Sequence, residues 1–100
     1  MIRSKKITNA ARGQQCLINI AGVCNHNPET VVFCHFPDEH HGIAQKASDL
    51  SGAFGCAACH DAVDGRVKSD EWRSNRLYYM RRAQQRTMEK LFELGVIKIA

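Results

Sequence analysis

Residues 56–65 read Cys-Ala-Ala-Cys-His-Asp-Ala-Val-Asp-Gly, and their cysteine spacing is the strongest local signal in the chain. Its Cys-x-x-Cys pair, Cys56 and Cys59, can bind one tetrahedral ion, because a knuckle turn brings both sulfurs to the same side. The residues that follow read as a short helix that ends near Gly65. We therefore predict a metal-bound knuckle that leads directly into a helix.

A tetrahedral site needs two more ligands, and Cys16 and Cys24 are the natural second pair. A short hairpin would bring these two residues together. Zn²⁺ is the metal that a closed, all-thiolate site favours. Such a site would supply the folding free energy that a chain of 100 residues with a long loop lacks. The simpler alternative is that these are buried, reduced cysteines without a metal.

The string Cys56-Ala-Ala-Cys59-His60 is also the attachment signature of c-type haem. Haem attachment takes place outside the cytosol, and the basic start at residues 1–6 is followed by no apolar segment of a signal peptide. The sequence also contains no apolar run of the roughly 20 residues that cross a bilayer. We therefore expect a cytoplasmic protein with reduced thiols, without haem and without a membrane anchor.

Charge is divided unevenly between the centre of the chain and its two flanks. All five cysteines and all five histidines lie within residues 13–65, where one base and six acids give a net charge of −5. The flanks carry thirteen bases and four acids, a net charge of +9. A basic surface beside a ligand-rich centre indicates a polyanion held next to a metal. A solvated charged helix that follows an ordinary core is the plainer interpretation.

The composition, 44% apolar and 24% charged, is typical of a globular protein, and the length allows one domain. We expect a loose basic arm over residues 1–12 and a single zinc-bound domain over residues 13–100.

Within that domain, residues 16–20 and 30–36 read as the two strands of a hairpin, and residues 37–55 read as a long loop. The longest helix begins after the N-cap Ser69 and stops at Gly95. Its apolar stripe comprises Trp72, Tyr79, Ala83, Leu91 and Leu94. The tail at residues 96–99 adds a short strand or covers the core.

Two histidines stand where they can act on a phosphodiester. His35 ends the strand at residues 30–36, just before Pro37, and imidazole there can take a proton from water. His60 lies on the helix that the knuckle begins and can bind a second ion. A hydrated Mg²⁺ would polarise the scissile phosphate. The alternative for His35 is a hydrogen-bonded structural imidazole.

This order of parts resembles the HNH nucleases, which share a ββα-metal core. In that family the first histidine is the general base, a middle asparagine orients it, and the last histidine, on the helix, binds the catalytic metal. The resemblance implies that His35 is the base and His60 the metal ligand, while Asp49 stands where the asparagine is usual. Convergence of the four cysteines would bring the two imidazoles to one cavity.

The closer resemblance is to the small prophage-encoded nuclease family of the YbcO type. Similar segments occur along essentially the whole chain, at residues 10–13, 22–25, 27–30, 58–61 and 95–98. The resemblance implies an α+β fold with a treble-clef-like ββα-metal centre and a long C-terminal helix. We therefore expect a metal-dependent endonuclease that acts on DNA, with Mg²⁺ or Mn²⁺ as the catalytic ion.

Two positions depart from the HNH pattern. Cys34 precedes the base, where an aspartate or histidine often binds the metal, and a thiol suits Zn²⁺ better than Mg²⁺. Asp49 replaces the asparagine, and either side chain can accept the hydrogen bond that orients a base. The missing metal ligand can come from one of four residues: Asp38, His40, His41 or Asp64.

The basic flanks supply the expected contacts to nucleic acid. Such contacts position the phosphate backbone and carry no sequence information of their own. The candidates are Arg12, Arg66, Lys68, Arg73, Arg76, Arg82 and Arg86. The rival function is a zinc module that binds nucleic acid or protein without cleaving it.

Overall fold

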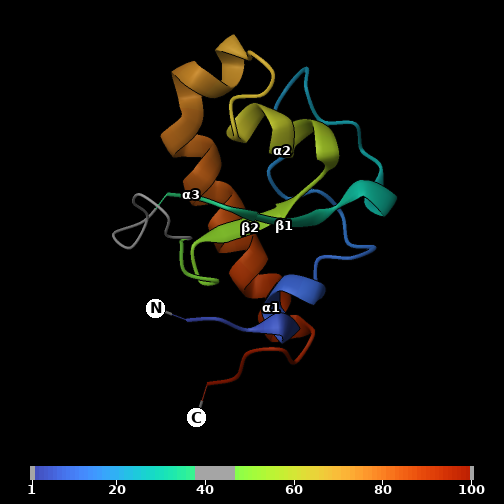
Figure 1. The fold of residues 1–100 in the computed structure, drawn as a ribbon. Helices are drawn as coiled ribbons and strands as arrows, with labels where there is room; N and C mark the ends of the chain where they lie inside the picture. Colours follow the sequence, from blue (N-terminus) through green and yellow to red (C-terminus); the bar gives the residue numbers. More distant parts are fainter. Residues whose placement is uncertain (1, 38–46, 100) are drawn as a thin grey trace.

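A computed structural model describes residues 2–37 and 47–99 (Figure 1). The elements follow one another as α1 (Lys5–Asn9), the short 3₁₀ helix η1 (Pro28–Thr30), β1 (Val32–His35), β2 (Gly52–Gly55), α2 (Ala57–Val63) and α3 (Asp70–Glu93). This is the small α+β arrangement with a long C-terminal helix that the sequence predicts. No helix in the described part of the chain is long and apolar enough to cross a membrane.

The sheet is an antiparallel pair in which Val32 faces Gly55 and His35 faces Gly52. A side chain at Gly52 would collide with the Cys34 carbonyl oxygen, so only glycine allows the two strands to approach this closely. β2 is buried along its length and lies against α3, where the Phe54 N–H donates to Thr87 Oγ1 at 3.1 Å. In Figure 1 the pair crosses α3, with α2 on one side of the strands and α1 on the other.

Two strand predictions around this sheet are wrong. Residues 52–55 were expected within the loop, but the small residues of β2 fit between β1 and α3. Residues 16–20 form no strand, because their backbone turns: Asn19 has a φ of 47°, and the N–H groups of Asn19 and Ile20 donate to cysteine sulfurs. The partner of β1 is therefore β2.

Helix α3 begins and ends as its sequence predicts. The Ser69 Oγ accepts a hydrogen bond from the Trp72 N–H at 3.1 Å, and Gly95 follows the last turn with a φ of +73°. Four residues of the predicted apolar stripe are buried, but Leu94 is 45% exposed. Thr87 takes an additional place on the buried face, because its hydroxyl accepts the N–H of β2.

The N-terminal residues are part of the folded core. Helix α1 is capped by the Ser4 hydroxyl, and Ile7 and Ala11 are buried in the same hydrophobic cluster as the sheet. The expectation of a loose arm is therefore wrong for this segment. At the other end, Val96 and Ile97 pack against the core without forming a strand, and Ile99 is 83% exposed.

Candidate metal centres and active site

Four cysteine sulfurs converge at the start of α2. The Sγ atoms of Cys16, Cys24, Cys56 and Cys59 all lie within 4.8 Å of one another. Cys56 is the N-cap of α2 and Cys59 lies in its first turn, so the helix itself holds this pair together. The other pair comes from the irregular segment before η1. The predicted convergence is confirmed, and this donor set fits one tetrahedrally bound metal ion.

Backbone amides surround these four sulfurs. The N–H groups of Asn19, His26 and Ile20 donate to Cys16, Cys24 and Cys59 at 3.4 Å, and those of Asn25 and Cys59 donate to Cys56 at 3.5 and 3.4 Å. Hydrogen bonds of this kind stabilise thiolate charge and orient metal ligands.

Backbone strain is concentrated in the same turns. Asn19 and His26 are the two non-glycine residues with positive φ in the described part of the chain, at 47° and 56°. Each donates its N–H to the cysteine two or three residues before it. A left-handed residue costs about 1–3 kcal/mol and persists where its surroundings impose it. Here these surroundings are the turns in which the N–H groups of Asn19 and His26 donate to cysteine sulfurs.

Crowding and burial of the sulfurs shift the pKa values of Cys16, Cys24 and Cys59. A hydrogen bond from the Cys59 side chain lowers the pKa of Cys16 to about 4, and the same contact, together with burial, raises the pKa of Cys59. Burial raises the pKa of Cys24 to about 11. Adjacent sulfurs cannot all carry charge without a cation, and a bound metal ion would replace the thiol protons.

A second group of potential ligands lies beside the first. Cys34 of β1 meets His60 and Asp64 of α2, and their ligand atoms lie within 4.8 Å of one another. His60 and Asp64 are one helical turn apart, with Nε2 and Oδ2 separated by 3.1 Å. Cys34 is buried, which raises the pKa of its thiol to about 12. This donor set of sulfur, imidazole nitrogen and carboxylate oxygen fits a divalent ion with an open position.

His35 binds a different partner. Its Nε2 lies 2.7 Å from Asp49 Oδ1, so the two residues that the resemblance pairs are in contact. Asp49 is itself held by the Ser4 N–H, which donates to Oδ2 at 2.7 Å, and by Arg3 at 3.7 Å. Burial opposes the ionisation of Asp49, but the bonds from His35 and Ser4 outweigh it and lower the pKa of Asp49.

The contribution of Ser4 and Arg3 is a feature that sequence reasoning missed. Arg3 lies in the segment expected to be a loose arm, but its guanidinium lies near Asp49 and donates to the Ala47 carbonyl. The signal is tertiary, because residues 2–4 and 47–49 are far apart in the chain.

Asp49 makes stability depend on pH. Because its pKa in the folded protein lies below the ordinary value of 3.8, its contribution is complete above the unfolded-state pKa and is lost as pH falls through the folded-state pKa. We expect Asp49→Asn to lower the free energy of unfolding by about 1–3 kcal/mol at neutral pH. The difference from wild type should shrink below about pH 4. Urea unfolding of both proteins across this range measures it, and a constant difference would contradict the assignment.

The two candidate histidines occupy different surroundings. Consecutive residues of a strand point to opposite faces, so Cys34 turns to α2 while His35 turns to Asp49, on the same side as Phe33. The β1 residue that meets His60 is therefore Cys34. A common cavity for both imidazoles stays a prediction. Of the candidates for the further ligand, Asp64 joins the cluster, and Asp38, His40 and His41 lie outside the described residues.

Two of the predicted nucleic-acid contacts have partners within the protein. Arg66 pairs with Asp61 at 2.7 Å and with Asp64 at 3.0 Å. Arg82 donates to the carbonyls of Ile18 and Asn19 at 3.0 and 3.2 Å. The other candidates are exposed: Arg12, Lys68, Arg73, Arg76 and Arg86.

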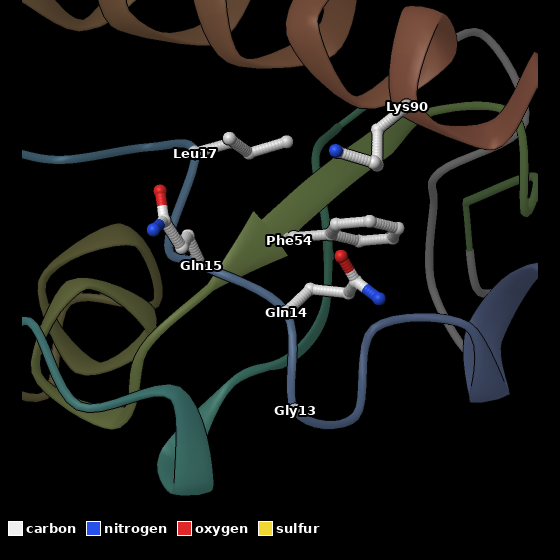
Figure 2. A pocket seen from close by; sticks show the side chains of 6 residues that line it. All are labelled: Gly13, Gln14, Gln15, Leu17, Phe54 and Lys90. Atoms are coloured by element: carbon white, nitrogen blue, oxygen red, sulfur yellow. The ribbon is translucent and has the colours of Figure 1, made fainter. Parts of the chain in front are cut away.

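Two cavities differ in their relation to these groups. One, of about 350 Å³, lies between α2 and α3, where Asp64 is joined by three basic side chains, Lys68, Arg73 and Arg76. The other, of about 320 Å³, is shown in Figure 2. Its lining includes Gln14, Phe54 and Lys90, and none of the predicted catalytic or metal-binding residues. The first cavity is therefore the one that adjoins the second ligand group.

Comparison with known proteins agrees with the family resemblance seen in the sequence. The family profile described as "Putative nuclease YbcO" matches residues 5–96. The chain belongs to the YbcO family. Two curated YbcO proteins, from Escherichia coli strain K12 and Enterobacteria phage 82, both named as a "putative nuclease", are each 44% identical to it over 62 residues. These alignments cover 61% of this chain and 65% of each relative, so the chain spans just under two thirds of their length.

A solved structure supports the same relationship. It is described as "a putative bacteriophage protein" from Escherichia coli K-12, and it matches with a TM-score of 0.71 and 36% identity. The match covers 88% of this chain and 98% of the other. The YbcO family thus spans bacterial and phage proteins and is named for nuclease activity.

Proposed function

We propose that this YbcO family member is a metal-dependent endonuclease that hydrolyses DNA, built on an HNH-like centre with structural Zn²⁺ on its four convergent cysteines. The observation that carries the proposal is the His35–Asp49 pair at the end of β1, next in sequence to a cluster of metal-binding side chains. A general base and a divalent ion that act on the same phosphate together provide a route for phosphodiester hydrolysis.

His35 is the proposed general base. An ionised Asp49 only accepts hydrogen bonds, so the His35 Nε2 carries the hydrogen that joins the pair at 2.7 Å. Nδ1 then keeps its lone pair and can take a proton from a water molecule that attacks phosphorus. Asp49, fixed by the Ser4 N–H, holds the ring in this tautomer and orientation.

Cys34, His60 and Asp64 are the proposed ligands of the catalytic ion. A divalent ion bound there would polarise the phosphoryl oxygens and stabilise the leaving oxygen. Because Cys34 and His35 are neighbours, with Cα atoms about 3.8 Å apart, base and ligands belong to the same end of β1. Asp64 contacts His60 at 3.1 Å and Arg66 at 3.0 Å, and these contacts hold its carboxylate in place within the cluster.

The cavity between α2 and α3 is the proposed binding surface for the DNA backbone. Lys68, Arg73 and Arg76 line it together with Asp64, so phosphates that flank the scissile one would meet positive charge here. These contacts are expected to be insensitive to base sequence. Exposed Arg12 and Arg86 would extend the same electrostatic attraction.

A plasmid-nicking assay tests the function with two matched variants on α2. Asp64→Asn removes a proposed ligand and should lower nicking at least about 100-fold. Asp61→Asn changes a carboxylate that pairs with Arg66 and belongs to neither ligand group, so nicking should persist. Wild-type nicking should require a divalent ion and stop in chelator, and the same assay on RNA checks the preference for DNA.

The alternative function, a zinc module that does not cleave nucleic acid, predicts a different outcome of this assay. Binding of DNA without divalent-dependent nicking, unchanged in Asp64→Asn, would show a zinc module that binds nucleic acid and does not cleave it.

A further inference from the structure

The donor atoms of the second cluster are of three different kinds. β1 supplies the sulfur of Cys34, and α2 supplies the imidazole of His60 and the carboxylate of Asp64. The spacing of the α2 pair is i, i+4, which places both side chains on one face of the helix. The third donor, the sulfur of Cys34, approaches the same face from β1, which is distant from α2 in the sequence.

Cys34 differs from the other four cysteines in its surroundings. Each sulfur of the four-cysteine cluster accepts a hydrogen bond from at least one backbone N–H. Within the described residues, no hydrogen bond involves the Cys34 sulfur. Its side chain is 0% exposed and packs in the core opposite the small residue Ala53. Its sulfur lies within 4.8 Å of a ligand atom of His60 and of Asp64.

The chemistry of this set discriminates between ions. Mg²⁺ takes oxygen ligands in octahedral geometry and keeps several waters, whereas thiolate and imidazole suit Zn²⁺ and neighbouring transition metals. Three mixed protein ligands and one open position are the pattern of catalytic zinc sites. The side chains of His60 and Asp64 are about one third exposed, so the open position would lie on the solvent side, away from Cys34.

We propose that Cys34, His60 and Asp64 form a second metal site that selects a borderline divalent ion, Zn²⁺ or Co²⁺, over Mg²⁺, with the Cys34 thiolate as the selecting ligand. This inference differs from the sequence-based expectation of Mg²⁺ or Mn²⁺ as the catalytic ion. It rests on the proposed function only for the use of the open position by a phosphate, and metal binding itself is measured without any substrate.

The test is a Co²⁺ titration of the metal-free, refolded full chain, followed by absorbance, with the bound metal counted independently by mass spectrometry. Wild type should bind two ions per chain. The ion on the four cysteines should give the larger thiolate-to-metal absorbance, and the other a smaller one, because it adds one thiolate rather than four. Excess Mg²⁺ should displace neither ion.

Two variants of Cys34 separate the role of the thiolate from that of the fold. Cys34→Ser should keep the ion on the four cysteines and weaken the second by at least about 100-fold. Cys34→Asp should replace the thiolate with a carboxylate, a harder ligand, so that Mg²⁺ or Mn²⁺ competes with Co²⁺ for the site. His35→Ala is the matched control on the neighbouring residue and should still bind two ions, because its side chain faces Asp49.

Several outcomes would overturn the inference: one ion per wild-type chain, an unchanged second affinity in Cys34→Ser, or displacement of the second Co²⁺ by Mg²⁺ in wild type. Failure of the nuclease is distinguishable from this. Two bound ions without DNA nicking would support the metal site and contradict the nuclease proposal. Nicking supported by Mg²⁺ equally well in wild type and Cys34→Ser would support the nuclease proposal and contradict the thiolate site.

Discussion

The Cys59→Ser protein is expected to be unfolded under conditions in which wild type is folded, even with excess zinc. Cys59 is fully buried, and its sulfur lies within 4.8 Å of three others. Structural zinc contributes about 10–16 kcal/mol of apparent binding free energy in small zinc domains. This is as large as the whole stability of a typical domain, about 5–15 kcal/mol. Loss of one of four ligands at the proposed zinc site should therefore remove the fold.

Circular dichroism and thermal unfolding, with zinc and with chelator, measure this effect. Wild type in chelator should resemble Cys59→Ser. Cys34→Ala is the matched control, because it removes a buried cysteine that lies outside the four-sulfur cluster, and it should remain folded with a modest loss of stability. A Cys59→Ser protein that melts cooperatively near the wild-type temperature would show that the metal does not hold this domain together.

The second large effect is expected at His35. Replacement by alanine should lower DNA nicking by about 10²–10⁴-fold, the usual contribution of a positioned general base. The fold and the DNA affinity should be retained, since the side chain is partly exposed and its main polar partner is Asp49. Nicking by purified wild type and His35→Ala, with zinc content and DNA binding measured on the same samples, checks the prediction.

Chemical rescue distinguishes a base from a structural histidine. Free imidazole should restore part of the activity of His35→Ala, because the Asp49 carboxylate that orients the ring is still fixed by the Ser4 N–H. It should have no effect on Asp64→Asn, which lacks a metal ligand rather than a base. Equal residual nicking by wild type and His35→Ala would remove the assignment.

Short-range sequence features predicted several parts of this structure correctly. The Cys56-x-x-Cys59 spacing, the Ser69 cap and the Gly95 stop are confirmed, because each depends on residues within one helical turn of one another. β1 was also found, since its β-branched and aromatic residues favour an extended backbone.

Long-range features were predicted less well. The pairing of residues 16–20 with β1 was wrong, because the N–H groups of Asn19 and Ile20 donate to cysteine sulfurs, and the N–H of Leu17 donates to the Phe54 carbonyl of β2. β2 was missed, because the sequence Gly-Ala-Phe-Gly has little intrinsic preference for a strand and is extended only where β1 and α3 enclose it. Propensity is a local quantity, and here packing overrides it.

In the candidate site, too, some features were predicted from the sequence and others became visible only in the structure. Cysteine spacing predicted the four-cysteine cluster, which is confirmed, and the resemblance to HNH nucleases suggested His35, Asp49 and His60, whose roles stay a prediction. The contact of Cys34 with His60 and Asp64, and the hydrogen bond from Ser4 to Asp49, became visible only in the folded chain. The physical reason is that strand alternation and the docking of α2 and the N-terminal segment choose which side chains meet, and no local pattern encodes that choice.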